Sequence, residues 1–212
     1  MLIRFREPVN SATHLTGAVF AALGLVWLVS LTHADLAKLI SVAVYGLSMI
    51  MLYLASGIFH LFNGSERTIL WLRRIDHAAI YFLIAGTYTP FCYTVLTGEW
   101  RWLMLALVWG LAFVGAVYKL LFLRGDDNRL SLYFYVAMGW VGVIALPQAL
   151  PLMPPSAAVL LIAGGISYMI GAVIFGLEKP NFHPQFGHHE IWHLLVLGGS
   201  AFHFAAVVRV IG

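Results

Sequence analysis

Charged residues are scarce in this chain: they make up 10% of its 212 residues, whereas soluble globular domains carry roughly 25%. Apolar residues make up 61%, which excludes an ordinary soluble domain and is typical of a chain solvated by lipid. The single cysteine, Cys92, excludes an internal disulfide. The formal net charge of +3 is too small an excess to indicate a nucleic-acid partner.

Long apolar segments are abundant instead. Gly17 to Leu31 and Ala157 to Leu177 reach or approach the ~20 residues that a helix needs to cross a bilayer. They lack the alternation of apolar and polar residues that a transmembrane β-barrel requires. The sequence therefore predicts an all-α, polytopic membrane protein, a single domain over residues 1–212 with seven transmembrane helices. The expected spans are 12–31, 37–61, 77–97, 101–122, 130–148, 156–177 and 188–210.

The basic residues predict the orientation of these helices. Nine lie on one side of the predicted bundle and three on the other, and the side richer in lysine and arginine is normally cytoplasmic. The nine are Arg4, Arg6, Arg67, Arg73, Arg74, Lys119, Arg124, Arg129 and Lys179, and the three are Lys38, Arg101 and Arg209. We therefore expect a cytoplasmic N-terminus and a C-terminus outside. Nothing before the first helix resembles a cleavable signal peptide, so that helix is expected to act as the insertion signal.

Histidines gather at the helix ends that this orientation places in the cytoplasm. They are His14 in the first helix, His60 at the end of the second, His77 beside Asp76 at the start of the third, and His188, His189 and His193 in the seventh. Ionisable residues at a membrane are costly and usually functional. The orientation rests on lysine and arginine alone, so this convergence is a separate indication of a site.

The spacing of the histidines suits a metal ion. His189 and His193 are four residues apart, which places them on one helical face, about 6 Å apart along the axis. Ser56 and His60 repeat that spacing. Three neutral imidazoles with one open position are typical of catalytic zinc. The sequence thus predicts a zinc site formed by His60, His189 and His193, in which Asp76 orients water or takes its proton and Ser56 lies nearby.

Other interpretations of these residues stay open. An isolated histidine at a helix end is usually interfacial or hydrogen-bonded, and serine is common where membrane helices pack. Asp76 could equally cap a helix that begins at residue 77, and Glu190 is a second carboxylate at a suitable depth. His203 lies about 15 Å beyond His193 along the helix, so we expect it to make an interhelical hydrogen bond and not to bind the same metal.

Five segments, spread in order over nearly the whole chain, carry a family resemblance. They are Glu7-Pro-Val-Asn10-Ser-Ala-Thr-His14, Ser56-Gly-Ile-Phe-His60, Asp76-His77, Gly86-Thr-Tyr-Thr-Pro90 and His189-Glu-Ile-Trp-His193. Together they resemble the hemolysin III family, bacterial relatives of the progestin and adipoQ receptors. The resemblance implies a seven-helix fold with a cytoplasmic N-terminus in the bacterial cytoplasmic (inner) membrane.

The resemblance also implies zinc near the cytoplasmic face. The motifs of the receptor relatives correspond to His60, His189 and His193 as zinc ligands, with Asp76 and Ser56 near the water on the zinc. A further family box corresponds to Glu7, Asn10 and His14, for which it implies only hydrogen bonding at the cytoplasmic mouth. Two features depart from the pattern. His188 adds a neighbour to the ligands, and the short N-terminus lacks the long cytoplasmic extension of the animal receptors.

Two classes of function follow from the resemblance. The first is a zinc-dependent integral membrane hydrolase that cleaves an amide or ester bond in a membrane lipid or fatty-acyl substrate, as implied by the ceramidase-like activity associated with the receptor relatives. The alternative is a non-enzymatic membrane-homeostasis regulator or receptor with structural zinc. A hemolytic pore is least favoured, because no expected helix carries a continuous polar stripe. The sequence predicts neither the individual substrate nor the oligomeric state.

Overall fold

The computed structural model describes residues 6–123 and 128–212, and their regular elements are helices. In chain order these are α1 (Pro8–Thr32), α2 (Leu36–Leu61), α3 (Glu66–Thr94), α4 (Gly98–Phe122), α5 (Asn128–Trp140), η1 (Val141–Ala145), α6 (Leu146–Ala149), η2 (Leu150–Leu152), α7 (Pro155–Leu177) and α8 (His188–Ile211). The all-α prediction is confirmed. Arg4 and Arg124, which contributed to the predicted orientation, lie outside the described residues.

Seven segments of the described chain are long enough to cross a membrane. Six of them are also apolar enough by composition: α1, α2, α4, the broken segment Leu130–Leu152, α7 and α8. The seventh is α3, whose 29 residues extend over about 44 Å at 1.5 Å per residue. Its first turns carry Arg67, Arg73 and Arg74, which lower its mean hydropathy. The prediction of seven membrane helices is therefore confirmed.

The outer surface of this bundle is apolar. Phe20, Val26 and Val114 are 68%, 69% and 71% exposed, an arrangement that would cause aggregation in water and suits contact with lipid tails. The main core lies between α1, α2, α3 and α8, and in it Leu28, Val42 and Val207 are fully buried. The bundle is thus packed inside and solvated by lipid outside.

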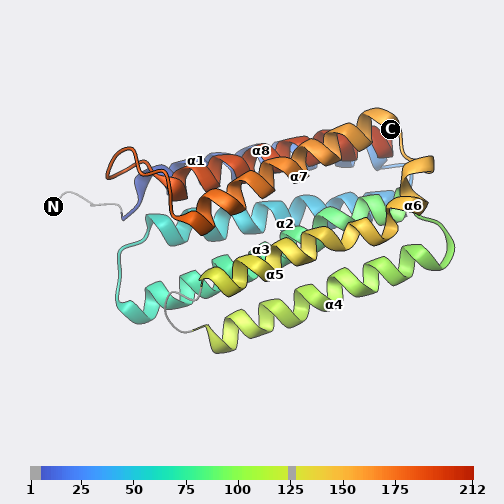
Figure 1. Ribbon diagram of the computed structural model, residues 1–212. Helices are drawn as coiled ribbons and strands as arrows, with labels where there is room; N and C mark the ends of the chain where they lie inside the picture. The colour runs from blue at the N-terminus through green and yellow to red at the C-terminus, as the bar shows by residue number, and fades with distance from the viewer. Residues whose placement is uncertain (1–5, 124–127) are drawn as a thin grey trace.

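The order of the helices in space brings distant parts of the chain together. α2 and α3 lie in the middle, with α1, α7 and α8 on one side and α4 and α5 on the other (Figure 1). α1 packs on α2 and α8, and α3 contacts α8 as well as its chain neighbours α2 and α4. α1 begins at one end of the bundle and α8 ends at the other (Figure 1). The beginnings of α1, α3 and α8 and the end of α2 therefore meet at one end.

The predicted start of the third helix was wrong. We expected a span beginning at residue 77 after a loop, whereas α3 begins at Glu66, and the hydroxyl of Ser65 caps it by accepting from the backbone N–H of Thr68 at 3.3 Å. Hydropathy marks only the part of a helix that lies in lipid, so the charged turns that precede it were missed. Asp76 consequently lies inside α3, and its interpretation as an N-cap is excluded.

We expected residues 130–148 to form one continuous helix, but the fifth span is broken. α5 ends at Trp140 and short 3₁₀ and α segments follow, since Pro147 and Pro151 lack a backbone N–H and clash with the preceding turn. The hydroxyl of Tyr88 on α3 accepts from the N–H of Gly142 at 2.7 Å and donates to the carbonyl of Gly139 at 2.6 Å. These bonds satisfy backbone groups that the break frees within the membrane. The other five spans end within four residues of the prediction.

Candidate metal centre

Three histidines from two helices lie together at the end of the bundle where α2 ends and α8 begins. One ring nitrogen from each of His60, His189 and His193 lies within 4.8 Å of the other two. Tetrahedral zinc with bonds of about 2.0–2.1 Å holds its ligand atoms about 3.3 Å apart, so nitrogens within 4.8 Å of one another would have to approach by about 1.5 Å at most to share one ion. Nδ1 of His193 is buried without a hydrogen-bond partner. The donor set and geometry therefore fit zinc.

The start of α8 is held in place locally, and this fixes two of the three rings. The carboxylate of Glu190 accepts a hydrogen bond of 2.7 Å from the backbone N–H of Gly187, the residue that precedes the helix. His189 and His193 follow on one face, with ring centroids 5.0 Å apart. Glu190 thus contributes to the start of the helix, and its carboxylate is not part of the three-histidine group.

His60 comes from the last turn of α2 and is 1% exposed. Its ring centroid lies 5.1 Å from that of His189 and 4.7 Å from that of His193. Nδ1 of His60 donates a 2.6 Å hydrogen bond to the carboxylate of Glu7, just before α1. That bond leaves Nε2 of His60 as the nitrogen able to bind a metal. Ser56 is buried one turn earlier on the same helix.

Asp76 lies beside the histidines but outside their group. Its side chain is 10% exposed, and one carboxylate oxygen is 3.6 Å from Nδ1 of His77. It also interacts by charge with His60 and His14. The position suits a residue that acts next to a metal without binding it.

Three other histidines have partners outside the cluster. Nδ1 of His77 donates to the carbonyl of Arg73 at 2.9 Å, within its own helix. His188 is turned away to the side-chain oxygen of Asn181, 2.8 Å from Nδ1, which removes the ambiguity that its position beside His189 created. His203 donates from Nε2 to the carbonyl of Leu161 on α7 at 3.1 Å. The predicted interhelical hydrogen bond of His203 is thereby confirmed.

His14 in α1 and Glu7 just before it have contacts that the sequence did not reveal. The ring of His14 is buried and stacks on that of His193, with centroids 3.8 Å apart and planes 15° apart. Glu7 precedes α1. Burial raises the pKa of its carboxyl, but the hydrogen bonds and charges of His60, Asn10 and Arg6 outweigh burial and lower that pKa to about 2. The advance signal was the family box of Glu7, Asn10 and His14, for which the resemblance implied only hydrogen bonding.

The fold and the site define a seven-helix membrane protein with a cluster of three histidines, two of them buried, that can hold a metal ion. Comparison with known families then identifies it further. Residues 3–204 match the family model described as haemolysin-III related, and the chain belongs to that family. The predicted resemblance to hemolysin III proteins is confirmed.

Relatives are found in bacteria and in animals. The chain is 38% identical to "Hemolysin-3" of Bacillus cereus over 95% of its own length and 90% of that protein. It is 37% identical to "Hemolysin-3 homolog" of Bacillus subtilis over 95% of its length and 92% of the relative. It is 27% identical to human "Monocyte to macrophage differentiation factor", over 96% of its length and 83% of the relative. The similarity therefore covers nearly the whole chain.

Proposed function

We propose that this protein is a zinc-dependent integral membrane hydrolase that cleaves an amide or ester bond in a lipid. The observation that carries the proposal is the group of His60, His189 and His193, two of them buried and His189 half-buried, with the carboxylate of Asp76 nearby. Three imidazoles are a donor set that suits zinc, whereas magnesium and calcium prefer oxygen ligands. Zinc bound there would polarise a carbonyl oxygen and lower the pKa of water toward ~7.

The roles of the chain's own groups follow from their places. Asp76 is the general base, since its carboxylate is next to the histidines without belonging to their group. Ser56, one turn from His60 on the inner face of α2, is a hydrogen-bond partner for the reacting oxygen. Burial of His60 and His193 keeps bulk water from the site and strengthens each of these interactions.

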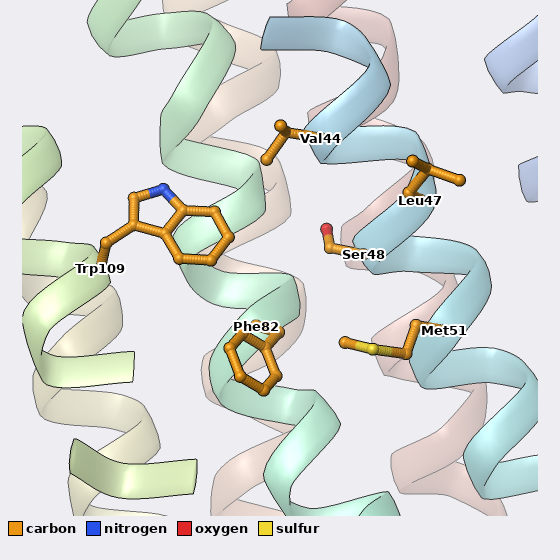
Figure 2. A pocket seen from close by; sticks show the side chains of 6 residues that line it. All are labelled: Val44, Leu47, Ser48, Met51, Phe82 and Trp109. Carbon is orange, nitrogen blue, oxygen red and sulfur yellow. The ribbon is translucent and has the colours of Figure 1, made fainter. Parts of the chain in front are cut away.

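The apolar surface supports a lipid as the substrate. A groove of about 300 Å³ lies between α2, α3 and α4, lined by Val44, Leu47, Ser48, Met51, Phe82 and Trp109 (Figure 2). Figure 2 shows Phe82 and Trp109 approaching from α3 and α4 toward the four residues of α2. This lining suits an acyl chain, and α2 and α3 are also the helices that carry Ser56 and Asp76.

A regulator or receptor with structural zinc is the second candidate. It is favoured by the depth of the cluster, where His60 and His193 are 1% and 2% exposed, and by the position of the ligands on two different helices. In such a protein the ion would join the end of α2 to the start of α8 and stabilise that end of the bundle. The two candidates differ in whether a lipid is turned over.

Purified wild-type protein is expected to carry about one zinc per chain and to release fatty acid from at least one member of a panel of acyl-amide and acyl-ester lipids. Removing the metal with a chelator should abolish product release, and adding zinc back should restore it. Zinc content and product are measured on the same preparation. Unchanged turnover after complete zinc removal would contradict the metal's role, and bound zinc without turnover on any lipid would favour the regulator.

We also propose that the metal centre faces the cytoplasm, with the N-terminal end of the bundle inside. The support is the lysine and arginine asymmetry, since the described basic residues Arg6, Arg67, Arg73 and Arg74 belong to the end that carries the histidines. The contact between Lys38 Nζ and the carbonyl of Ile211, at 3.1 Å, places Lys38 at the opposite end with the C-terminus.

A reporter fused after Gly212 tests this orientation. An alkaline phosphatase, which is active only outside the cytoplasm, is expected to be active there, and a fluorescent protein that folds only in the cytoplasm should stay dark. Fusion of the same pair after Ser65, in the connection between α2 and α3, should give the reverse result and serves as the control. A cytoplasmic C-terminus would overturn both the orientation and the placement of the site.

A further inference from the structure

Three polar residues at the start of α1 lie against the metal centre, and the proposed reaction does not use them. Glu7, Asn10 and His14, called here the α1 box, are spaced three and four residues apart and so share one face. Asn10 and His14 are 1% and 3% exposed. Buried polar groups at this depth are costly unless they have partners. The amide nitrogen of Asn10 has them, whereas both ring nitrogens of His14 are buried without a hydrogen-bond partner.

Glu7 contacts His60 in two separate ways. Its carboxylate accepts the 2.6 Å hydrogen bond from Nδ1 of His60. Its backbone N–H donates to the carbonyl of His60 at 3.0 Å. The backbone bond docks the start of α1 on the end of α2 whatever the side chain at position 7. The carboxylate acts on the imidazole itself, because it holds the proton on Nδ1 and turns Nε2 toward the other two histidines.

Asn10 extends the contact to α8. Its side-chain amide donates to the carboxylate of Glu7 at 3.1 Å and to that of Glu190 at 2.8 Å. Glu190 in turn caps the start of α8, immediately after His189. One amide therefore links the carboxylate that orients His60 to the helix that carries the other two rings. His14 completes the box by stacking on His193.

We propose that Glu7 is a positioning residue for the metal centre, acting through His60, and that Asn10 braces it against α8. The inference rests on the proposed metal site. A carboxylate on the second nitrogen of a metal-binding histidine fixes the tautomer and orientation of the ring and makes it a stronger ligand, and loss of such a partner typically weakens metal binding by roughly 10- to 100-fold.

Metal binding by Glu7 variants tests the inference without reference to activity. Full-length wild-type, Glu7→Gln and Glu7→Ala proteins are purified, stripped of metal and titrated with zinc against a chromophoric chelator. We expect the zinc Kd to rise about 10- to 100-fold for Glu7→Ala and by a smaller factor for Glu7→Gln, since a neutral amide still accepts a hydrogen bond but more weakly. The visible spectrum of bound cobalt(II) should change in both, because the ligand field of His60 changes.

Glu66→Gln is the matched control. Glu66 is an exposed glutamate in the first turn of α3, and it does not belong to the three-histidine group. It should bind zinc and cobalt like wild type. Glu7→Gln keeps the side-chain volume and the backbone bond to His60, so its melting temperature without metal should match that of wild type. Equal zinc Kd and cobalt spectra for Glu7→Gln, Glu7→Ala and wild type would overturn the inference alone. A wild type that binds no zinc would overturn the proposed metal site as well.

Discussion

Replacement of His193 by alanine is expected to remove most of the zinc from the purified protein. His193 is 2% exposed and supplies one of the three nitrogens within 4.8 Å of one another. Loss of a direct ligand should weaken zinc binding by more than the roughly 10- to 100-fold that loss of a supporting partner costs. Zinc per chain, measured by mass spectrometry after dialysis against a weak chelator, is the readout.

His203→Ala is the matched control on the same helix. His203 is half-buried, but it donates to the carbonyl of Leu161 on α7 and is far from the cluster along α8. Hydrogen bonds between membrane helices are worth about 0.6 kcal/mol on average, so this variant should fold, lose a little stability and keep its zinc. Equal zinc retention by the two variants would show that the ligands have been wrongly assigned.

Substitution of Asp76 by asparagine is expected to reduce lipid hydrolysis by about 10²- to 10⁴-fold while most of the zinc remains. Asparagine keeps the size of the side chain and its capacity for hydrogen bonds but removes the base, and general-base catalysis is typically worth this factor. Zinc should stay because the carboxylate does not belong to the three-histidine group. Zinc content, melting temperature and product release are measured on one preparation.

The same variant separates the enzyme from the regulator. If zinc only joins α2 to α8, Asp76→Asn should shift the melting temperature slightly and alter no rate, since there is no turnover to lose. Glu190→Gln provides a comparison, because Glu190 caps α8 and lies outside the histidine group. It should lower stability more than Asp76→Asn and reduce hydrolysis less. Undiminished hydrolysis by Asp76→Asn would remove Asp76 from the mechanism.

Local properties of the sequence explain what could be predicted of the fold. Whether a segment crosses a membrane depends mainly on the transfer of about 20 consecutive side chains into lipid. Five spans were therefore predicted to within a few residues of their ends, and the fifth was predicted in the right region but not as a broken helix. The start of α3 could not be found this way. Glu66 to Ile75 form helix outside the apolar stretch, and the cap at Ser65 is a weak signal beside the charges that follow.

For the candidate site, too, local sequence predicts some features and not others. His189 and His193 could be paired in advance because the helical repeat alone sets their separation. The sequence could not decide whether Asp76 caps α3 or lies inside it, because the two alternatives differ only in where α3 begins. Glu7 was missed as a partner of His60 because their hydrogen bond joins residues 53 positions apart, and no local pattern encodes such a contact.

By itself the sequence determined that the chain enters the membrane, where it crosses, and which helix ends carry histidine, since each depends on neighbouring residues along one helix. Helical spacing and the family motifs proposed which three of the nine histidines form a site, but only the tertiary structure shows their ring nitrogens within 4.8 Å of one another. His188, next to a member of the cluster, turns to Asn181, whereas His60 joins from another helix. The physical reason is that a metal centre needs ligand atoms within a few ångströms in space, and that distance is set by how α1, α2, α3 and α8 pack.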